Sequence, residues 1–294
     1  MEKAAYIIQA LFFPMPNYLL ALAISTGIVA HARKKKSLSP DGAAGAFVLG
    51  MATCTSTYAY FTLILLVFFL ASSKLTKFKA ERKKLLESDY EHASERTLIQ
   101  VICNGFTGGV LAVLFQIYCE PYLTCFDTSR MATVLLWAYM GHYACCAGDT
   151  WASELGILNK SWPVSIIHFK QVPPGTNGGV SSLGLLASLA GGATIGLTGA
   201  ISMSLQQKCH GVAWELVIVG ALAGLGGSLV DSVLGATVQK TLYSKKRRMV
   251  VSEGEDKDAV AIGSGWDILD NHQVNLASSL ITSFACGAAA YWLY

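Results

Sequence analysis

Long apolar runs recur along the 294-residue chain and constrain its fold more than any other feature of the sequence. Several reach about 17–25 residues, the length at which an α-helix crosses a bilayer. Only 14% of the residues are charged, whereas about 25% is usual in soluble domains. The sequence therefore predicts an all-α, polytopic helical membrane protein, with residues 1–294 forming a single integral membrane domain in the lipid bilayer. The net charge of +3 gives no indication of a nucleic-acid partner.

About seven or eight spans are expected from these runs, including a short hairpin and a glycine-rich turn that opens a later span. The approximate ranges are 17–32, 43–54, 59–72, 98–118, 131–153, 180–204, 212–242 and 274–294. The second and third ranges could form one long helix or a tight hairpin. The hairpin is preferred, because lysine clusters flank both ends and a single crossing would place these clusters on opposite sides of the membrane.

Three clusters of basic residues determine the expected orientation, since positive residues are enriched on the cytoplasmic side. They follow the first span, the hairpin and the penultimate span, at 33–36, 74–84 and 245–248. Eight spans that start outside place all three clusters inside and both termini outside. Residues 73–96 then form a cytoplasmic amphipathic segment, either a solvated surface helix or one that attracts anionic lipid or phosphate. Residues 243–272 form a polar cytoplasmic loop.

Acidic residues in two of the predicted spans are the first candidates for chemistry. Asp149 and Glu154 lie near the end of one span, where ionisable groups usually face a bundle interior or a water-filled cavity. Five positions separate them, roughly 140° around an ideal helix, so one helix face cannot hold both. Either the helix ends between them or they have different roles. The alternative is a polar pair that fixes helix packing.

Asp231 is a buried charge in the glycine-rich stretch 224–235 of the next-to-last span, and it needs a partner. A Mg²⁺ ion shared with Asp149 would supply one, since magnesium takes a few carboxylates and leaves sites for phosphate and water. A hydrogen bond to Lys240 or to another helix is the alternative. Asp149, Glu154 and Asp231 are therefore the candidate metal ligands.

A glycine-rich turn, Gly175-Thr-Asn-Gly-Gly179, precedes the span at 180–204. Thr176 or Asn177 is expected to cap that helix, whose free N–H groups would bind an anion. Lys170, just upstream, would add positive charge. The alternative is an ordinary tight turn into a helix whose glycines allow close packing. The candidate phosphate-binding residues here are Gly175, Thr176, Asn177, Gly178, Gly179 and Ser181.

Four further polar residues lie near the ends of spans. Asp270 and Asn271 suit a helix N-cap, and Asn275 lies one turn further along the chain. Asn104 is a lone amide near the start of its span, where a packing hydrogen bond is the alternative to a ligand contact. Carboxylates beside an anion site favour phosphoryl or nucleotidyl transfer, in which positioning and charge neutralisation dominate. A substrate with a lipid tail would explain a site built within a membrane.

Three stretches together resemble the transmembrane protein 19 family, over most of the chain from about Ser39 onward. They are Gly148-Asp-Thr-Trp-Ala-Ser-Glu-Leu-Gly156, Pro174-Gly-Thr-Asn-Gly-Gly-Val-Ser181 and Leu269-Asp-Asn-His-Gln-Val-Asn275. That family includes the chloroplast phytyl-phosphate kinase of vitamin E synthesis and a plant plasma-membrane glucose-responsive regulator. For its kinase members, the resemblance implies phosphorylation of an isoprenoid monophosphate to the diphosphate by a nucleoside triphosphate.

A more distant resemblance is to phosphatidate cytidylyltransferases and polyprenol kinases. Asp149 ahead of Lys170 and Gly175, followed by Gly227 to Asp231, is similar to their order of an aspartate-bearing helix before a lysine/glycine loop. The Ser-Pro-Lys-Lys-Thr type of loop is absent from this chain, which leaves the choice of nucleotide open.

The resulting hypothesis is a membrane-embedded isoprenyl-phosphate kinase whose site faces the cytoplasm. Its catalytic residues would be Asp149, Glu154, Lys170 and Asp231, with Mg²⁺ as cofactor and CTP or ATP as phosphoryl donor. The alternative is a transporter or sensor that binds an ion or a phosphorylated small molecule. The N-terminus lacks an Arg/Ser-rich transit pattern, so an ER-like endomembrane or the plasma membrane is favoured over the chloroplast. The oligomeric state is left open.

Overall fold

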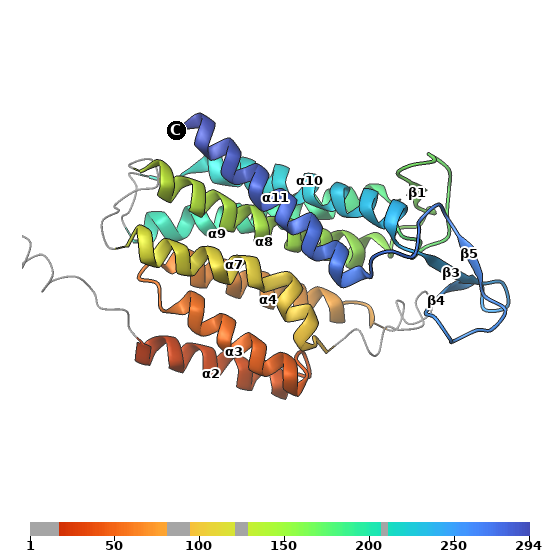
Figure 1. Cartoon of the computed structure of the whole chain (residues 1–294), viewed down its shortest axis with the longest axis horizontal. Coiled ribbons are helices and arrows are strands. Elements are labelled where there is room, and N and C mark those ends of the chain that lie inside the picture. The colour runs from red at the N-terminus through yellow and green to blue at the C-terminus, as the bar shows by residue number, and fades with distance from the viewer. Residues whose placement is uncertain (1–17, 81–94, 121–128, 207–210) are drawn as a thin grey trace, which may run out of the picture.

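The computed structural model describes residues 18–80, 95–120, 129–206 and 211–294, which form a bundle of helices. Successive helices run in alternating directions along the bundle (Figure 1). The eight helices of the described residues are α2 (Tyr18–Lys34), α3 (Pro40–Cys54), α4 (Ala59–Lys77), α7 (Leu98–Tyr118), α8 (Arg130–Gly156), α9 (Ser182–Leu205), α10 (Trp214–Val238) and α11 (Asn271–Leu293). The prediction of an all-α, polytopic fold is confirmed.

Five of the described helices are long and apolar enough to cross a membrane: α4, α7, α9, α10 and α11. α2 and α3 are shorter, with 17 and 15 residues. α8 has 27 residues but is more polar, and it is buried continuously from Leu135 to Gly148. Because its neighbours cover it on all sides over this stretch, α8 meets protein where the other helices meet lipid.

The hairpin preferred for residues 43–72 is present, because α3 and α4 are separate antiparallel helices (Figure 1). Ser39 caps α3: its hydroxyl accepts a hydrogen bond from the Gly42 N–H at 3.2 Å, and Pro40 occupies the first helical position. The cap also ties two distant segments together, since the Ser39 N–H donates to the Arg96 carbonyl at 3.1 Å.

Glycines allow the backbones of α8, α9 and α10 to meet directly. A Cβ atom on Gly148 of α8 would lie 2.5 Å from the Gly224 carbonyl oxygen of α10. A Cβ on Gly224 would lie 2.7 Å from the Gly192 Cα of α9. Such approach is the usual role of small residues between membrane helices. It brings Asp149, which follows Gly148, toward the end of α10 that carries Asp231.

Short strands are present at one end of the bundle, and they correct two predicted boundaries. α10 ends at Val238, not near residue 242, and the predicted loop 243–272 contains most of a sheet ordered β4-β3-β5. Its antiparallel strands are β3 (Thr241–Ser244), β4 (Met249–Val251) and β5 (Val260–Ile262). The β-branched and aromatic residues of these strands favour pairing over a further helical turn.

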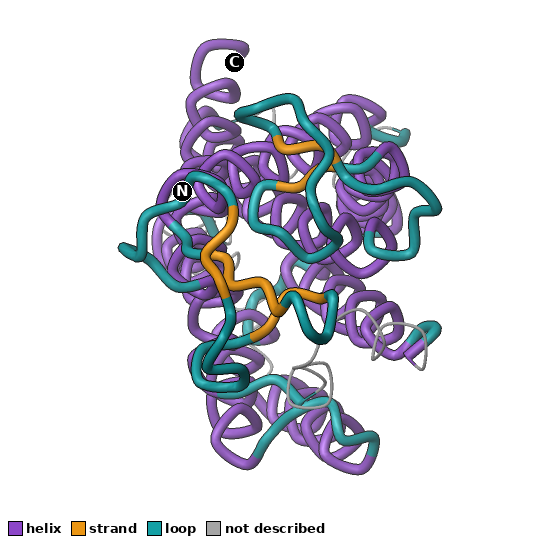
Figure 2. Tube along the Cα trace, turned by 90° about the vertical axis from the view of Figure 1, so that its right-hand side faces the viewer, coloured by secondary structure: helices purple, strands orange, loops and turns teal. Residues whose placement is uncertain are grey.

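A two-stranded pair, β1 (Val164–Ser165) with β2 (Gly179–Val180), precedes α9. Viewed from this end of the bundle, the strands and loops lie across the ends of the helices (Figure 2). α11 begins at Asn271, three residues before the predicted start of the last span.

The described parts of the three predicted basic clusters, residues 33–36, 74–80 and 245–248, also lie at this end. The Lys77 ammonium donates to the Lys35 carbonyl and, at 3.0 Å, to the Ser37 hydroxyl, so the first two clusters are in contact. Residues 245–248 form the turn between β3 and β4. Residues 73–77 of the predicted amphipathic segment belong to α4, and its residues 81–94 lie outside the described part of the chain.

The glycine contact gives a test of the packing. Gly224→Ala is expected to lower the free energy of unfolding by about 1–3 kcal/mol, because its Cβ has no space between α9 and α10. Gly226→Ala on the same helix is the matched control, since a Cβ there meets nothing within 4 Å. Unfolding of both variants in mixed micelles would measure the difference. Equal stabilities would contradict the direct backbone contact.

Asp256 gives a test at the sheet, outside the helices. A hydrogen bond from the Ser244 hydroxyl, and a second from the Asp258 N–H at 3.0 Å, hold the pKa of Asp256 below its usual value. Stability from this carboxylate is therefore fully present above the ordinary aspartate pKa of about 4, and it is lost as the pH falls through the lowered value. Amide hydrogen exchange of β3 and β4, corrected for intrinsic rates, should show this loss in the wild type. Asp256→Asn should show weaker protection with less dependence on pH.

Candidate functional site

A polar cavity of about 420 Å³ lies at the end of the bundle where the basic clusters and strands are found. Its walls come from α4, α7, α8, α9, α10 and α11 and from the turn before α9. The predicted site residues that line it are Asn104, Asp149, Glu154, Gly175, Thr176, Asn177, Gly178, Gly179, Ser181, Asp231, Asn271 and Asn275. Twelve of the fourteen residues singled out from the sequence therefore surround one space.

Asp149 and Asp231 form the acidic centre of this cavity. They come from adjacent helices, α8 and α10, and their carboxylates interact electrostatically. Each carboxylate has a serine partner: Asp149 is hydrogen-bonded by Ser228, and Asp231 accepts a bond from the Ser278 hydroxyl at 2.9 Å. Lys240 is not the partner of Asp231, since its ammonium lies 3.4 Å from Asp267.

Glu154 lies on a different part of the cavity wall. α8 continues through Glu154 to Gly156, so the helix does not end between Asp149 and Glu154. Glu154 instead interacts electrostatically with Arg96, which precedes α7. The two acidic residues of α8 therefore have different partners. This agrees with the prediction that they have different roles.

The donor set around Asp149 and Asp231 suits a hard cation. Carboxylate, hydroxyl and amide oxygens surround the pair, and magnesium is usually bound by one or two carboxylates with the remaining positions left to water and phosphate. Within the described residues, no three His, Cys, Asp or Glu side chains form a group that could hold a metal ion. The prediction of three carboxylate ligands is thus reduced to two, Asp149 and Asp231.

The glycine-rich turn differs from the predicted phosphate cradle. The N–H groups of Thr176, Asn177 and Gly179 donate to the Pro173 carbonyl, the Thr241 hydroxyl and the Thr176 carbonyl, at 3.2, 3.2 and 2.9 Å. Backbone donors that already bind protein acceptors are poorly placed to bind phosphate as well. The predicted cap is also corrected, because Ser181 caps α9 by accepting a bond from the Gly184 N–H at 3.1 Å.

The glycines of this turn serve its conformation and its contact with α10. Gly175 and Gly178 have positive φ angles of 84° and 74°, which favour glycine over other residues. A Cβ atom on Gly178 would lie 2.8 Å from the Ser232 carbonyl oxygen, one residue beyond Asp231. The turn therefore closes the cavity at the end of α10.

Two predicted residues lie outside the cavity lining. Lys170 is exposed, and its carbonyl accepts a bond from the Ser165 N–H at 2.8 Å in the loop between β1 and β2. It therefore does not supply the positive charge expected of it. Asp270 caps α11 and forms a capping box with Gln273. The sequence predicts a helix cap at Asp270 or Asn271, and Asp270 has this role.

The amides have mixed roles. The Asn104 side-chain amide donates to the Gln100 carbonyl of its own helix at 2.9 Å, and the main-chain carbonyl oxygen of Asn104 lies 3.0 Å from Nε2 of the buried His142. The surrounding acceptors assign the Asn275 amide nitrogen, not its oxygen, to the side that faces Asp231. In this orientation the nitrogen donates to the Asn271 carbonyl at 2.9 Å and to Asp231 at 3.3 Å. Asn275 therefore orients an acidic residue.

Several residues of the site were not singled out from the sequence: Arg96, Gln100 and Ser228 line the cavity, and Ser278 donates a hydrogen bond to Asp231. Arg96 follows a run of charged residues and reads as part of that solvated segment. Ser228 and Ser278 resemble the other small polar residues of their helices. The signal that could have identified Ser228 is its spacing from Asp231, three residues or about one helical turn.

Comparison with known proteins agrees with the membrane architecture. The chain is 41% identical to Protein PGR of Arabidopsis thaliana over 292 residues, which cover 96% of this chain and 99% of that protein. It is 28% identical to an uncharacterised membrane protein of Methanocaldococcus jannaschii, over 71% of this chain and 77% of that one. An uncharacterised membrane protein of Synechocystis is 27% identical over 79% and 83%.

No solved structure matches the chain. The sequence does match, over residues 23–283, the family described as integral membrane protein DUF92. This match covers most of the chain and includes every residue that lines the polar cavity. The protein is a member of the DUF92 family of integral membrane proteins.

Proposed function

We propose that this protein is a membrane-embedded kinase that transfers a phosphoryl group from a nucleoside triphosphate to an isoprenyl monophosphate. The observation that carries the proposal is the pair Asp149 and Asp231 inside a polar cavity of about 420 Å³ at the end of a membrane bundle. That volume is within the range of small-molecule sites. The resemblance of stretches 148–156, 174–181 and 269–275 to the transmembrane protein 19 family gives the isoprenyl phosphate as acceptor.

The charges of the cavity favour a site that takes phosphate together with a cation. Asp149, Glu154 and Asp231 line it, while the guanidinium of Arg96 is the one Lys or Arg side chain among its described lining residues. Phosphate groups would be repelled by this excess of carboxylates unless a divalent ion were bound with them. Mg²⁺ held by Asp149 and Asp231 would neutralise charge on the phosphoryl group during transfer.

The remaining cavity residues would position the reactants. In the reaction, an oxygen of the isoprenyl phosphate attacks the terminal phosphorus of the donor, and the nucleoside diphosphate leaves with the electrons of the broken P–O bond. Ser228, Ser278 and Asn275 hold the two aspartates in place through the hydrogen bonds described above. Arg96 offsets the charge of Glu154 and provides a cation in the lining of the cavity.

The proposal includes an orientation and a location. The basic residues of 33–36, 74–77 and 245–248 are at the same end of the bundle as the cavity. Enrichment of positive residues on the cytoplasmic side then supports a cavity open to the cytoplasm, where CTP or ATP is available. The favoured locations remain an ER-like endomembrane or the plasma membrane.

The test is a transfer assay with purified protein, prenyl monophosphates of several chain lengths, and CTP or ATP labelled in the terminal phosphate. Asp149→Asn is expected to lower the transfer rate about 100-fold or more, as does loss of other groups that stabilise transition-state charge. Lys170→Gln and Asp258→Asn should retain the wild-type rate, because neither residue lines the cavity. Absence of transfer with every chain length and donor, or full activity of Asp149→Asn, would refute the kinase.

Thermal stability separates a catalytic Asp149 from a residue that only fixes packing. Without metal, Asp149→Asn removes one of two repelling carboxylates and should unfold at the same temperature as the wild type or higher. A packing role predicts a lower unfolding temperature instead.

Removal of the metal gives a second readout that does not need turnover. Chelation with EDTA should abolish transfer, and millimolar Mg²⁺ should raise the unfolding temperature of the wild type, because a ligand that binds only the folded state stabilises it. Asp231→Asn should reduce this shift to that of a variant lacking both aspartates. An equal shift in the wild type and the double variant would show that Mg²⁺ binds elsewhere.

The alternative function, a transporter or sensor, predicts a different outcome of the same experiments. Equilibrium binding of a phosphorylated ligand without turnover, or flux in liposomes, would favour it. The arrangement of Asp149 and Asp231 on two adjacent membrane helices is compatible with an ion site of that kind.

A further inference from the structure

A second, apolar cavity of about 70 Å³ lies beside the polar one. It is enclosed by α2, α3, α4 and the start of α7, helices that contribute little to the acidic centre. Among its lining residues are Val29, Ala46, Leu49, Leu65, Phe69 and Val101. Its volume is about half that of an engineered cavity that holds benzene, so it has room for about three or four carbons of a single chain.

The two cavities share part of their walls. Phe68, Arg96, Gln100 and Asn104 line both, so the polar and the apolar cavity adjoin at these four residues. A molecule that occupied both would therefore need a polar group on one side of this wall and a hydrocarbon chain on the other.

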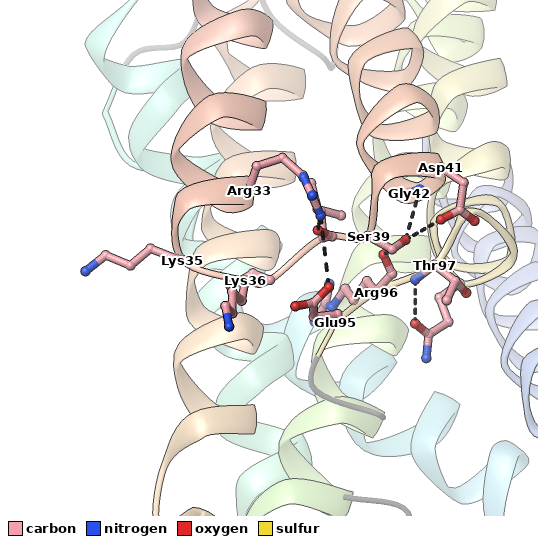
Figure 3. A network of polar contacts seen from close by, with 12 residues as sticks. Arg33, Lys35, Lys36, Ser39, Asp41, Gly42, Glu95, Arg96 and Thr97 are labelled. Carbon is pink, nitrogen blue, oxygen red and sulfur yellow. Dashed lines mark hydrogen bonds and ion pairs between the residues drawn. The ribbon is translucent and has the colours of Figure 1, made fainter. Parts of the chain in front are cut away.

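Arg96 is held at this boundary by its backbone. Its N–H donates to the Ser37 carbonyl and its carbonyl accepts from the Ser39 N–H, each at 3.1 Å, which joins it to the α2–α3 connection (Figure 3). Its guanidinium carbon lies 5.4 Å from the centre of the Phe68 ring and 5.7 Å from that of Phe69. A fixed guanidinium beside aromatic rings presents its charge to the polar cavity at the point where the apolar cavity begins.

We propose that the apolar cavity binds the first carbons of a single-chain isoprenyl or alkyl phosphate, and that Arg96 binds its phosphate in the polar cavity. This inference rests on the proposed function and specifies how its acceptor is recognised. The half-buried lining residues Ile28, Val29 and Leu66 place the outer side of the cavity at the surface of the bundle. The rest of the tail leaves by this side and lies in the bilayer.

The dimensions and charge favour this occupant over a two-chain phospholipid. A cavity with room for three or four carbons does not accept two acyl chains at a glycerol backbone. Arg96 is the one Lys or Arg side chain among the described lining residues, so an anionic headgroup would bind there in competition with Glu154, which is in electrostatic contact with Arg96. A neutral alcohol would use the apolar cavity but not Arg96.

The experiment measures equilibrium binding to the full chain in detergent with millimolar Mg²⁺ and without nucleotide, using farnesyl monophosphate, farnesol and inorganic phosphate as separate probes. The wild type should bind farnesyl monophosphate at least about tenfold more tightly than either fragment. Each buried methylene contributes a factor of about four in affinity, and a charge-assisted hydrogen bond about ten- to a hundredfold. Competition with phosphatidic acid at equal potency would identify a structural lipid and overturn the proposal.

A matched pair of variants on α3 tests the tail site. Ala46→Leu adds three carbons at a residue that lines the cavity, so it should fill the space and weaken binding of farnesyl monophosphate and farnesol by about tenfold or more. Ala44→Leu makes the same change at an exposed position of the same helix and should leave both affinities within about twofold. Unfolding temperatures confirm folding of both variants, and Ala46→Leu is expected to be at least as stable as the wild type because it fills a cavity. Equal affinities of the two variants would overturn the tail site.

The role of Arg96 is tested by comparing a ligand that has a phosphate group with one that has the same hydrocarbon tail but no phosphate. Arg96→Gln should weaken binding of farnesyl monophosphate about ten- to a hundredfold and leave farnesol unchanged, while Arg96→Lys should restore part of the lost affinity. An equal loss for both ligands would mean that Arg96 acts only through the fold and would overturn its assignment.

The same variants separate this inference from the kinase proposal. The expected binding pattern without transfer would refute the kinase but retain the site for an isoprenyl phosphate. Transfer that is equally efficient in the wild type and Ala46→Leu at limiting farnesyl monophosphate would retain the kinase and refute the tail site.

Discussion

The direct contact of backbones among α8, α9 and α10 is the interaction on which the rest of the structure depends. Gly148, Gly192 and Gly224 remove the side chains that would otherwise separate these helices. As a result, carboxylates on two different helices meet in one cavity, each with a serine partner. Two facing carboxylates disfavour close approach in the absence of a cation. The close packing that the glycines allow holds the two carboxylates in place. The free energy of this packing therefore offsets the electrostatic repulsion between them.

Much of the architecture follows from the sequence, because the length and hydropathy of one contiguous segment are enough to predict a membrane helix. α7 has the boundaries expected from its apolar run, and the α3–α4 hairpin follows from the placement of lysines at both of its ends. Successive spans cross the membrane in opposite directions, so the helix ends that carry Asp149, Asp231 and Asn275 lie on one side. The glycine turn lies at the same end. Their roles as ligands remain predictions.

What the sequence did not predict depends on contacts between distant residues. Lys170 has the right spacing for a phosphate-binding residue, yet the β1–β2 loop carries it to the surface. Arg96 resembles its charged neighbours in sequence and enters the cavity only because residues 37 and 39 bind its backbone. The turn at 175–179 has the composition of an anion site, but Pro173 and Thr241 each accept one of its N–H groups. For Arg96 and Asn177 the partner lies on another element, and a pattern along one segment contains no information about it.

The burial of α8 has a consequence for how the protein enters the membrane. This helix carries Arg130, His142, Asp149 and Glu154, and it is not among the five helices apolar enough to insert by composition. Ionisable residues at the centre of a lone helix oppose transfer into lipid. Much of the surface that covers α8 belongs to α9, α10 and α11, which are synthesised after it. We therefore expect stable insertion of α8 to depend on its packing against the C-terminal helices, one of which carries Asp231, the second acidic residue of the site.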